Sequence, residues 1–203
     1  MTDDSPTVNH HGDHPGFSGL SGTLCALVFL LTGRRSARLA AELTAVTADD
    51  HVVDIGCGPG TAVREAARRG ARATGVDPSA SMLAVGRAVF RRAGITLVEG
   101  EAEALPLPDA SATVVWALAT VHHWRAVDAG LTEAHRVLAS GGRLLAVERQ
   151  SPPGATGFAS HGWTRAQADA FADLCRSAGF TGATVGSERV GRRDVWTVSA
   201  TRP

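Results

Sequence analysis

The chain has 203 residues, of which 44% are hydrophobic and 20% are charged, and its 20 basic side chains balance 20 acidic ones. This length and composition fit one globular domain and exclude an intrinsically disordered chain. A formal net charge of zero also argues against a nucleic-acid-binding protein, which normally presents a strongly basic face.

Residues 1–16 form a polar N-terminal segment that contains His10, His11 and His14. Such a histidine group can suggest a metal site. However, the segment is terminal and rich in Pro and Gly, which favours a chain without a fixed conformation. We therefore expect a flexible tail here, and no metal site.

Residues 17–48 are expected to be helical. Apolar residues at helical spacing predict a helix over 20–31, and a second helical segment follows at about 36–46. The first helix is a lid over a ligand, a packed helix or a dimer surface. Its apolar stretch, LCALVFLL, has less than half of the ~20 residues that a bilayer crossing needs, and no Lys or Arg precedes it. Neither a membrane span nor a signal peptide is expected.

From residue 49 onward, strand and helix patterns alternate. Strands are expected at 51–55, 71–76, 95–98, 114–118 and 143–148, and helices at 61–69, 79–93 and 131–138. A capping box of Thr164 and Gln167 opens a last helix, and a hairpin near 183–189 and 194–200 follows. This succession predicts an α/β domain over 49–203, with a Rossmann-like, doubly wound sheet of seven strands, mostly parallel, and an antiparallel final strand.

The sequence VVDIGCGPG lies at the first expected strand-to-helix junction. Glycines there allow a ligand to approach the backbone, and the next helix offers unpaired amide donors. The spacing is GxGxG, whereas the dinucleotide fingerprint is GxGxxG. Asp54, two residues before the first glycine, would repel a pyrophosphate but suits a ligand with a cationic amine. The loop therefore favours an amino-acid nucleoside over NAD.

Asp77 ends the second expected strand, 17 residues after Gly60. A carboxylate at this point of a doubly wound sheet can accept hydrogen bonds from ribose hydroxyls. Asp77 and Pro78 could instead serve only as a turn and helix cap. The combination with the glycine loop favours ribose binding.

These segments, with EGEAEALPLPD and EAHRVLASGGRLLAVE, resemble the ordered motifs of class I S-adenosylmethionine-dependent methyltransferases. The resemblance covers about residues 45–150 and is to the small-molecule branch that includes the ubiquinone/menaquinone-biosynthesis C-methyltransferases. It implies S-adenosylmethionine as cofactor and S-adenosylhomocysteine as product. It also implies that Asp54, Gly56, Cys57 and Gly58 hold the methionine portion, and that Asp77 binds the ribose.

The same resemblance implies roles for four further residues. Met82 would lie against the adenine, and Ala117 would offer its carbonyl to the ligand's ammonium. Glu101 and Ala102 would contact the adenine amino group and a ring nitrogen. The family usually has Asp-Ala at this motif, so Glu101 departs from the pattern by one methylene group.

Methyl transfer needs mainly in-line positioning, with a base where the acceptor must lose a proton. His122 and His123 follow the fourth expected strand at the same crevice and are the candidate bases, although either could simply cap the strand or pack. Four more residues follow strand ends on that side and would line the acceptor pocket or pack: Trp124, Arg149, His161 and Trp163.

The three cysteines, Cys25, Cys57 and Cys175, form no CxxC pair, which favours a reducing cytoplasm and a packing role for Cys57. The expected partner is a small, fairly apolar methyl acceptor, with no nucleic acid and no membrane, and the protein is expected to be a monomer or homodimer. Two alternatives remain: a catalytically degenerate S-adenosylmethionine-binding protein and, less favoured by the loop, an NAD-binding Rossmann dehydrogenase.

Overall fold

The computed structural model describes residues 7–11 and 19–203. The helices and strands in chain order are α1 (Gly19–Thr32), α2 (Arg34–Leu43), β1 (His51–Ile55), α3 (Thr61–Arg68), β2 (Arg72–Asp77), α4 (Ala80–Phe90), β3 (Thr96–Glu99), β4 (Ala112–Leu118), η1 (Val121–His123), α5 (Val127–Val137), β5 (Leu138–Arg149), η2 (Gly157–Ser160), α6 (Arg165–Ser177), β6 (Thr181–Val190) and β7 (Arg193–Thr201).

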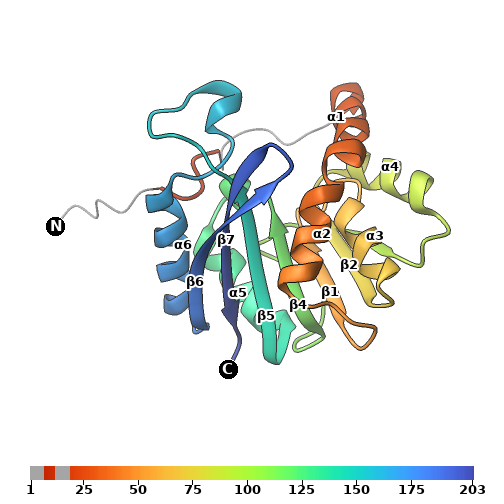
Figure 1. Cartoon of the computed structure of the whole chain (residues 1–203). Helices are drawn as coiled ribbons and strands as arrows, with labels where there is room; N and C mark the ends of the chain where they lie inside the picture. The colour runs from red at the N-terminus through yellow and green to blue at the C-terminus, as the bar shows by residue number, and fades with distance from the viewer. Residues whose placement is uncertain (1–6, 12–18) are drawn as a thin grey trace.

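The strands form a seven-stranded sheet in the order β3-β2-β1-β4-β5-β7-β6 (Figure 1). Strands β1 to β5 pair in parallel, whereas β7 is antiparallel to both β5 and β6. This confirms the predicted fold class. The expected strand at 51–55 matches β1, while β5 begins five residues before the expected 143 because Leu138 pairs with Ala112 ahead of a register shift.

Helices cover both faces of the sheet. Buried side chains of α2, α3 and α4 meet alternate residues of β1 and β4, such as Val52 and Trp116. The intervening residues of those strands, such as Val53 and Val115, face α5 and α6 in the other layer. This alternation follows from the two-residue period of a strand. It leaves the carboxyl ends of β1, β2 and β4 at one edge of the domain.

Residues 7–11, within the segment expected to be a flexible tail, contact the domain in the structure. Val8 is buried, and its carbonyl accepts a hydrogen bond of 3.0 Å from the Trp163 indole nitrogen. The Asn9 amide donates to the carbonyls of Trp124 and Arg125, both at 3.0 Å, and the His11 amide donates to His122. The polar residues have backbone acceptors in the domain, which composition alone could not show. His14 lies outside the described residues.

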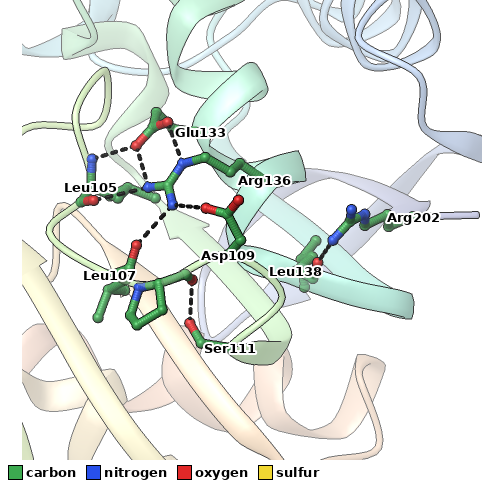
Figure 2. Close-up of polar contacts among 9 residues, drawn as sticks. Leu105, Leu107, Asp109, Ser111, Glu133, Arg136, Leu138 and Arg202 are labelled. Carbon is green, nitrogen blue, oxygen red and sulfur yellow. Dashed lines mark hydrogen bonds and ion pairs between the residues drawn. The ribbon is translucent and has the colours of Figure 1, made fainter.

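Arg136 of α5 fixes the loop between β3 and β4 (Figure 2). Its guanidinium donates to the carbonyls of Leu105 at 3.0 Å and Leu107 at 2.8 Å. It also donates to the carboxylates of Glu133 and Asp109 at 2.6–2.7 Å. One side chain thus holds the loop that begins just after β3 and carries two of the predicted adenine contacts.

Replacing Arg136 with alanine should lower the free energy of unfolding by about 2–3 kcal/mol, because several charge-assisted hydrogen bonds are lost at once. Urea unfolding would measure the change. Arg165→Ala, which removes an exposed ion pair with Asp169 on α6, is the control and should cost less than about 1 kcal/mol. Equal losses in the two variants would contradict the anchoring role of Arg136.

Candidate functional site

The backbone turns sharply after β1, with Gly56, Gly58 and Gly60 at φ values of 70°, 53° and 82°. The Gly56 amide donates to the Val76 carbonyl at 2.8 Å, which ties the bend to the end of β2. A Cβ on Gly56 would overlap the Thr120 side chain, whereas a Cβ on Gly58 would meet only Phe29, at 3.9 Å. The glycines therefore permit both a left-handed backbone and an open approach at Gly58.

Asp54 and Asp77 place two buried carboxyl groups beside this bend. Asp77 accepts hydrogen bonds from the amides of Gly58 at 2.7 Å and Ser79 at 2.9 Å. Asp54 is 2% exposed, and its Oδ1 has no hydrogen-bond partner among the described residues. Burial raises the pKa of Asp54 well above its ordinary value, and the nearby Asp77 raises it further. Burial also raises the pKa of Asp77, against the opposing effect of its two amide donors.

The other predicted cofactor residues lie at the same edge of the sheet. Met82 is buried in the first turn of α4, and its amide donates to the capping Ser79 hydroxyl at 3.3 Å. Ala117 is buried near the end of β4, in register with Ile55 of β1. Ala102 is buried after β3. Met82, Ala102 and Ala117 thus lie at or just after the carboxyl ends of β2, β3 and β4.

Glu101 lies in the same loop, but its carboxylate points to another partner. It forms an ion pair with Arg125 at 3.0 Å, and its side chain is 43% exposed. An exposed ion pair of this kind is weak and can be broken at small cost. To contact adenine as predicted, the Glu101 carboxylate would have to leave Arg125 or bind Arg125 and adenine at the same time.

Cys57 sits inside the bend and is buried. Burial raises the pKa of its thiol, as do the neighbouring carboxyl groups of Asp54 and Asp77. A thiol that stays protonated is a poor nucleophile, which agrees with the packing role expected from the sequence.

His122 lies in η1, directly after β4, and pairs with a residue that sequence analysis did not single out. Its Nδ1 lies 2.9 Å from Oε2 of Glu148, near the end of the adjacent strand β5. His122 is 3% exposed and Glu148 is fully buried, and Oε1 of Glu148 has no hydrogen-bond partner among the described residues. A buried carboxylate against one ring nitrogen can orient the ring and stabilise an imidazolium.

His123 has a different environment. Burial, together with the neighbouring His122 and His161, lowers the pKa of His123 to about 3. Its imidazole is therefore neutral at physiological pH and is a weak base. Of the two candidate bases, the surroundings favour His122.

Histidines from three separate segments of the chain lie close together around His122 and His123. The ring of His11 lies 5.8 Å from His122, 5.9 Å from His123 and 4.3 Å from His161, measured between ring centroids. His10 lies 6.0 Å from His122. Within residues 7–11 and 19–203, however, no group of three or more His, Cys, Asp or Glu side chains has the arrangement of a metal site.

The two tryptophans considered for the acceptor pocket pack instead. Trp163 is fully buried, with its ring 4.9 Å from that of Phe171. Trp124 is buried against Gly130, where a Cβ would strike its ring at 2.5 Å. His161 is brought to the histidine group. Arg149 ends β5, where its carbonyl accepts the Trp163 amide at 2.8 Å.

Comparison with known proteins agrees with this geometry. Residues 53–146 match a family model described as a methyltransferase domain. The ubiquinone/menaquinone biosynthesis C-methyltransferase of Rubrivivax gelatinosus is 40% identical over 119 residues, which cover 59% of this chain and 45% of that protein. The 27-O-demethylrifamycin SV methyltransferase of Amycolatopsis mediterranei is 40% identical over 122 residues, 56% of this chain and 43% of that protein. The chain thus spans about half the length of these curated relatives.

Solved structures show the same fold. The geranyl diphosphate C-methyltransferase of Streptomyces coelicolor, determined with S-adenosyl-L-homocysteine, has a TM-score of 0.68 at 18% identity and covers 83% of this chain and 77% of its own. A methyltransferase from Aquifex aeolicus has a TM-score of 0.68 at 16% identity, covering 86% and 92%. Residues 53–146 therefore match a methyltransferase domain, and the chain has the fold of these solved methyltransferases.

Proposed function

We propose that this protein transfers a methyl group from S-adenosylmethionine to a small organic acceptor. The observation that carries the proposal is the buried Asp54 carboxyl with an unpartnered oxygen, set beside a left-handed glycine bend in a methyltransferase domain. The curated relatives named above are methyltransferases of small molecules by their printed names, which supports the acceptor class.

The residues at the bend fit the cofactor. Asp54 offers a buried oxygen acceptor to a cationic amine, and Gly56, Cys57 and Gly58 leave the backbone open on the side of Gly58. Asp77 would hold the ribose, with Met82 and Ala102 beside the adenine and the Ala117 carbonyl near the amine. S-adenosylmethionine, when bound, would supply a methyl group attached to a positively charged sulfur. This sulfur is a good leaving group when an acceptor attacks the methyl carbon.

The chain's own contribution is to orient the two reactants and, where needed, to remove a proton. Holding reacting groups in line can supply up to ~7–11 kcal/mol of a reaction barrier. We assign the base to His122, because Glu148 holds Nδ1 and would stabilise the proton that the ring accepts. His123 is assigned a packing or hydrogen-bonding role, because its low pKa makes it a poor base.

Calorimetry with S-adenosylhomocysteine and with NAD tests the cofactor. Binding of the first and not of the second is expected, and binding of NAD alone would overturn the proposal. A screen for S-adenosylhomocysteine release across phenols, amines, carboxylates and carbon nucleophiles then tests turnover. Cofactor binding without release for any acceptor class would favour the catalytically degenerate alternative.

Asp77→Ala should weaken S-adenosylhomocysteine binding by ~1–3 kcal/mol, or about 5- to 150-fold, through loss of charge-assisted hydrogen bonds. Titration calorimetry measures the dissociation constant. Asp77→Asn separates the contribution of the negative charge from that of side-chain shape, because the amide keeps the size and one oxygen acceptor. Glu188→Gln, on the exposed edge strand β6, is the control and should leave affinity unchanged. An unaltered dissociation constant in Asp77→Ala would show that the ribose assignment is wrong.

A further inference from the structure

Helix α1 carries no charged side chain, yet several large apolar residues in its second half are exposed. Its sequence, GLSGTLCALVFLLT, contains no charged residue. The helix contacts α4 and α2 at one end of the domain (Figure 1). Leu27 and Val28 are each 49% exposed, and Leu31 is 73% exposed. A helix that is apolar all round is normally buried on all sides, so the exposed side requires a cover.

Arginines surround this exposed surface. Arg34, Arg35 and Arg38 follow α1 directly, and all three are exposed. A groove of about 570 Å³ runs between α1, α2, α3 and α4 and includes Leu27, Leu31, Val89, Arg34, Arg38 and Arg68 in its lining. Among the described residues, Arg34, Arg38 and Arg68 form no ion pair, and Glu65 is the one acidic residue of the lining. We call the exposed apolar side of α1, together with this groove and its arginines, the α1 face.

The charge of the α1 face distinguishes between the partners that could bind there, a second copy of the chain or a lipid surface. A symmetric dimer through this face would bring its arginines against the same arginines of the second copy, which is unfavourable. An anionic phospholipid surface offers both an apolar layer for the leucines and phosphates for the arginines. A helix of 14 residues is only ~21 Å long, which is too short to cross the ~30 Å hydrocarbon core.

We infer that the α1 face docks on an anionic membrane surface, with α1 lying in the interface and its flanking arginines on lipid phosphates. No helix among the described residues can cross a bilayer, and this mode of attachment needs no crossing. The inference goes beyond methyl transfer and stands without it. Phe29 of α1 is 38% exposed and lies 3.9 Å from where a Cβ on Gly58 would be, so a docked membrane would border the cofactor bend.

Vesicle flotation tests this inference with the full chain. Vesicles of equimolar phosphatidylglycerol and phosphatidylcholine should carry the wild-type protein upward, whereas pure phosphatidylcholine should carry much less. Leu31→Glu should reduce the partition coefficient about tenfold or more, because it places a charge in the apolar contact. The double variant Arg34→Ala, Arg38→Ala should reduce it roughly 30-fold, since each arginine near an anionic surface contributes about fivefold.

Two matched variants control for general effects. Leu43→Glu changes an exposed leucine at the far end of α2, and Arg165→Ala removes a charge on α6, at the opposite end of the sheet (Figure 1). Neither should alter flotation.

Failure of the wild-type protein to float, or equal losses in the controls, would overturn the inference. So would a wild-type dimer in sedimentation velocity that Leu31→Glu converts to a monomer, because a second copy would then be the cover. Calorimetry with S-adenosylhomocysteine is read separately: vesicle binding without cofactor binding would reject only the proposed methyl transfer.

Discussion

Replacing His122 with asparagine should lower the turnover number about 100- to 10,000-fold for an acceptor that must lose a proton, the range expected for loss of a positioned general base. The buried Glu148, 2.9 Å from the ring, makes this histidine the better placed of the two candidates. S-adenosylhomocysteine release, with the acceptor found in the screen, provides the rate. The dissociation constant for S-adenosylhomocysteine should stay within about twofold, because the assigned cofactor contacts do not include this ring.

His123→Asn is the matched control, since the two residues are adjacent and differ mainly in environment. Its pKa of about 3 means that its loss removes little base strength, so the rate should fall far less. Glu148→Gln should give an intermediate rate and a changed pH profile, because Glu148 acts through His122. Equal losses in the two histidine variants, or a pH profile unchanged in Glu148→Gln, would contradict the assignment.

Gly56→Ala should lower the free energy of unfolding by about 2–5 kcal/mol. The position has φ of 70°, and a left-handed backbone costs a residue with a Cβ about 1–3 kcal/mol. In addition, the new methyl group would lie 2.7 Å from Thr120 Cβ and closer still to its hydroxyl, which adds the cost of overpacking. Urea unfolding measures the change.

Gly94→Ala separates these two causes. Gly94 has a similar φ of 68°, but no atom lies within 4 Å of the added Cβ, so only the backbone cost of roughly 1 kcal/mol or slightly more applies. Thr120→Ala in the Gly56→Ala background should restore part of the lost stability. If Gly56→Ala and Gly94→Ala were equally destabilised, close packing between the bend and Thr120 would not be the reason for this glycine.

Much of the fold could be predicted because its signals are local. The capping box is present as expected, with the Thr164 amide donating to the Gln167 side chain at 2.9 Å. β1 could be placed because its five buried residues end directly at the glycine bend. The start of α5 at Val127 was missed by four residues, because Ala126, which caps it, makes no side-chain hydrogen bond that a pattern could reveal.

The place of His11 in the histidine group could not be predicted, because it depends on a contact between distant segments. His11 and His122 are 111 positions apart, and the hydrogen bond between them uses backbone atoms that no sequence motif encodes. Glu148 was more accessible to prediction. It lies one residue before the end of β5, which is parallel and adjacent to the strand that His122 follows, so the sheet order would have suggested the pair.

The position of β7 has a consequence for how the chain folds. Because β7 lies between β5 and β6, the edge of β5 that faces away from β4 and the edge of β6 that faces β5 stay unpaired until residues 193–201 become available. During synthesis, the nascent chain therefore holds two open strand edges after most of the domain has left the ribosome, and open edges are prone to mispairing. Truncations that remove residues 193–201 should leave an aggregating protein rather than a smaller stable one.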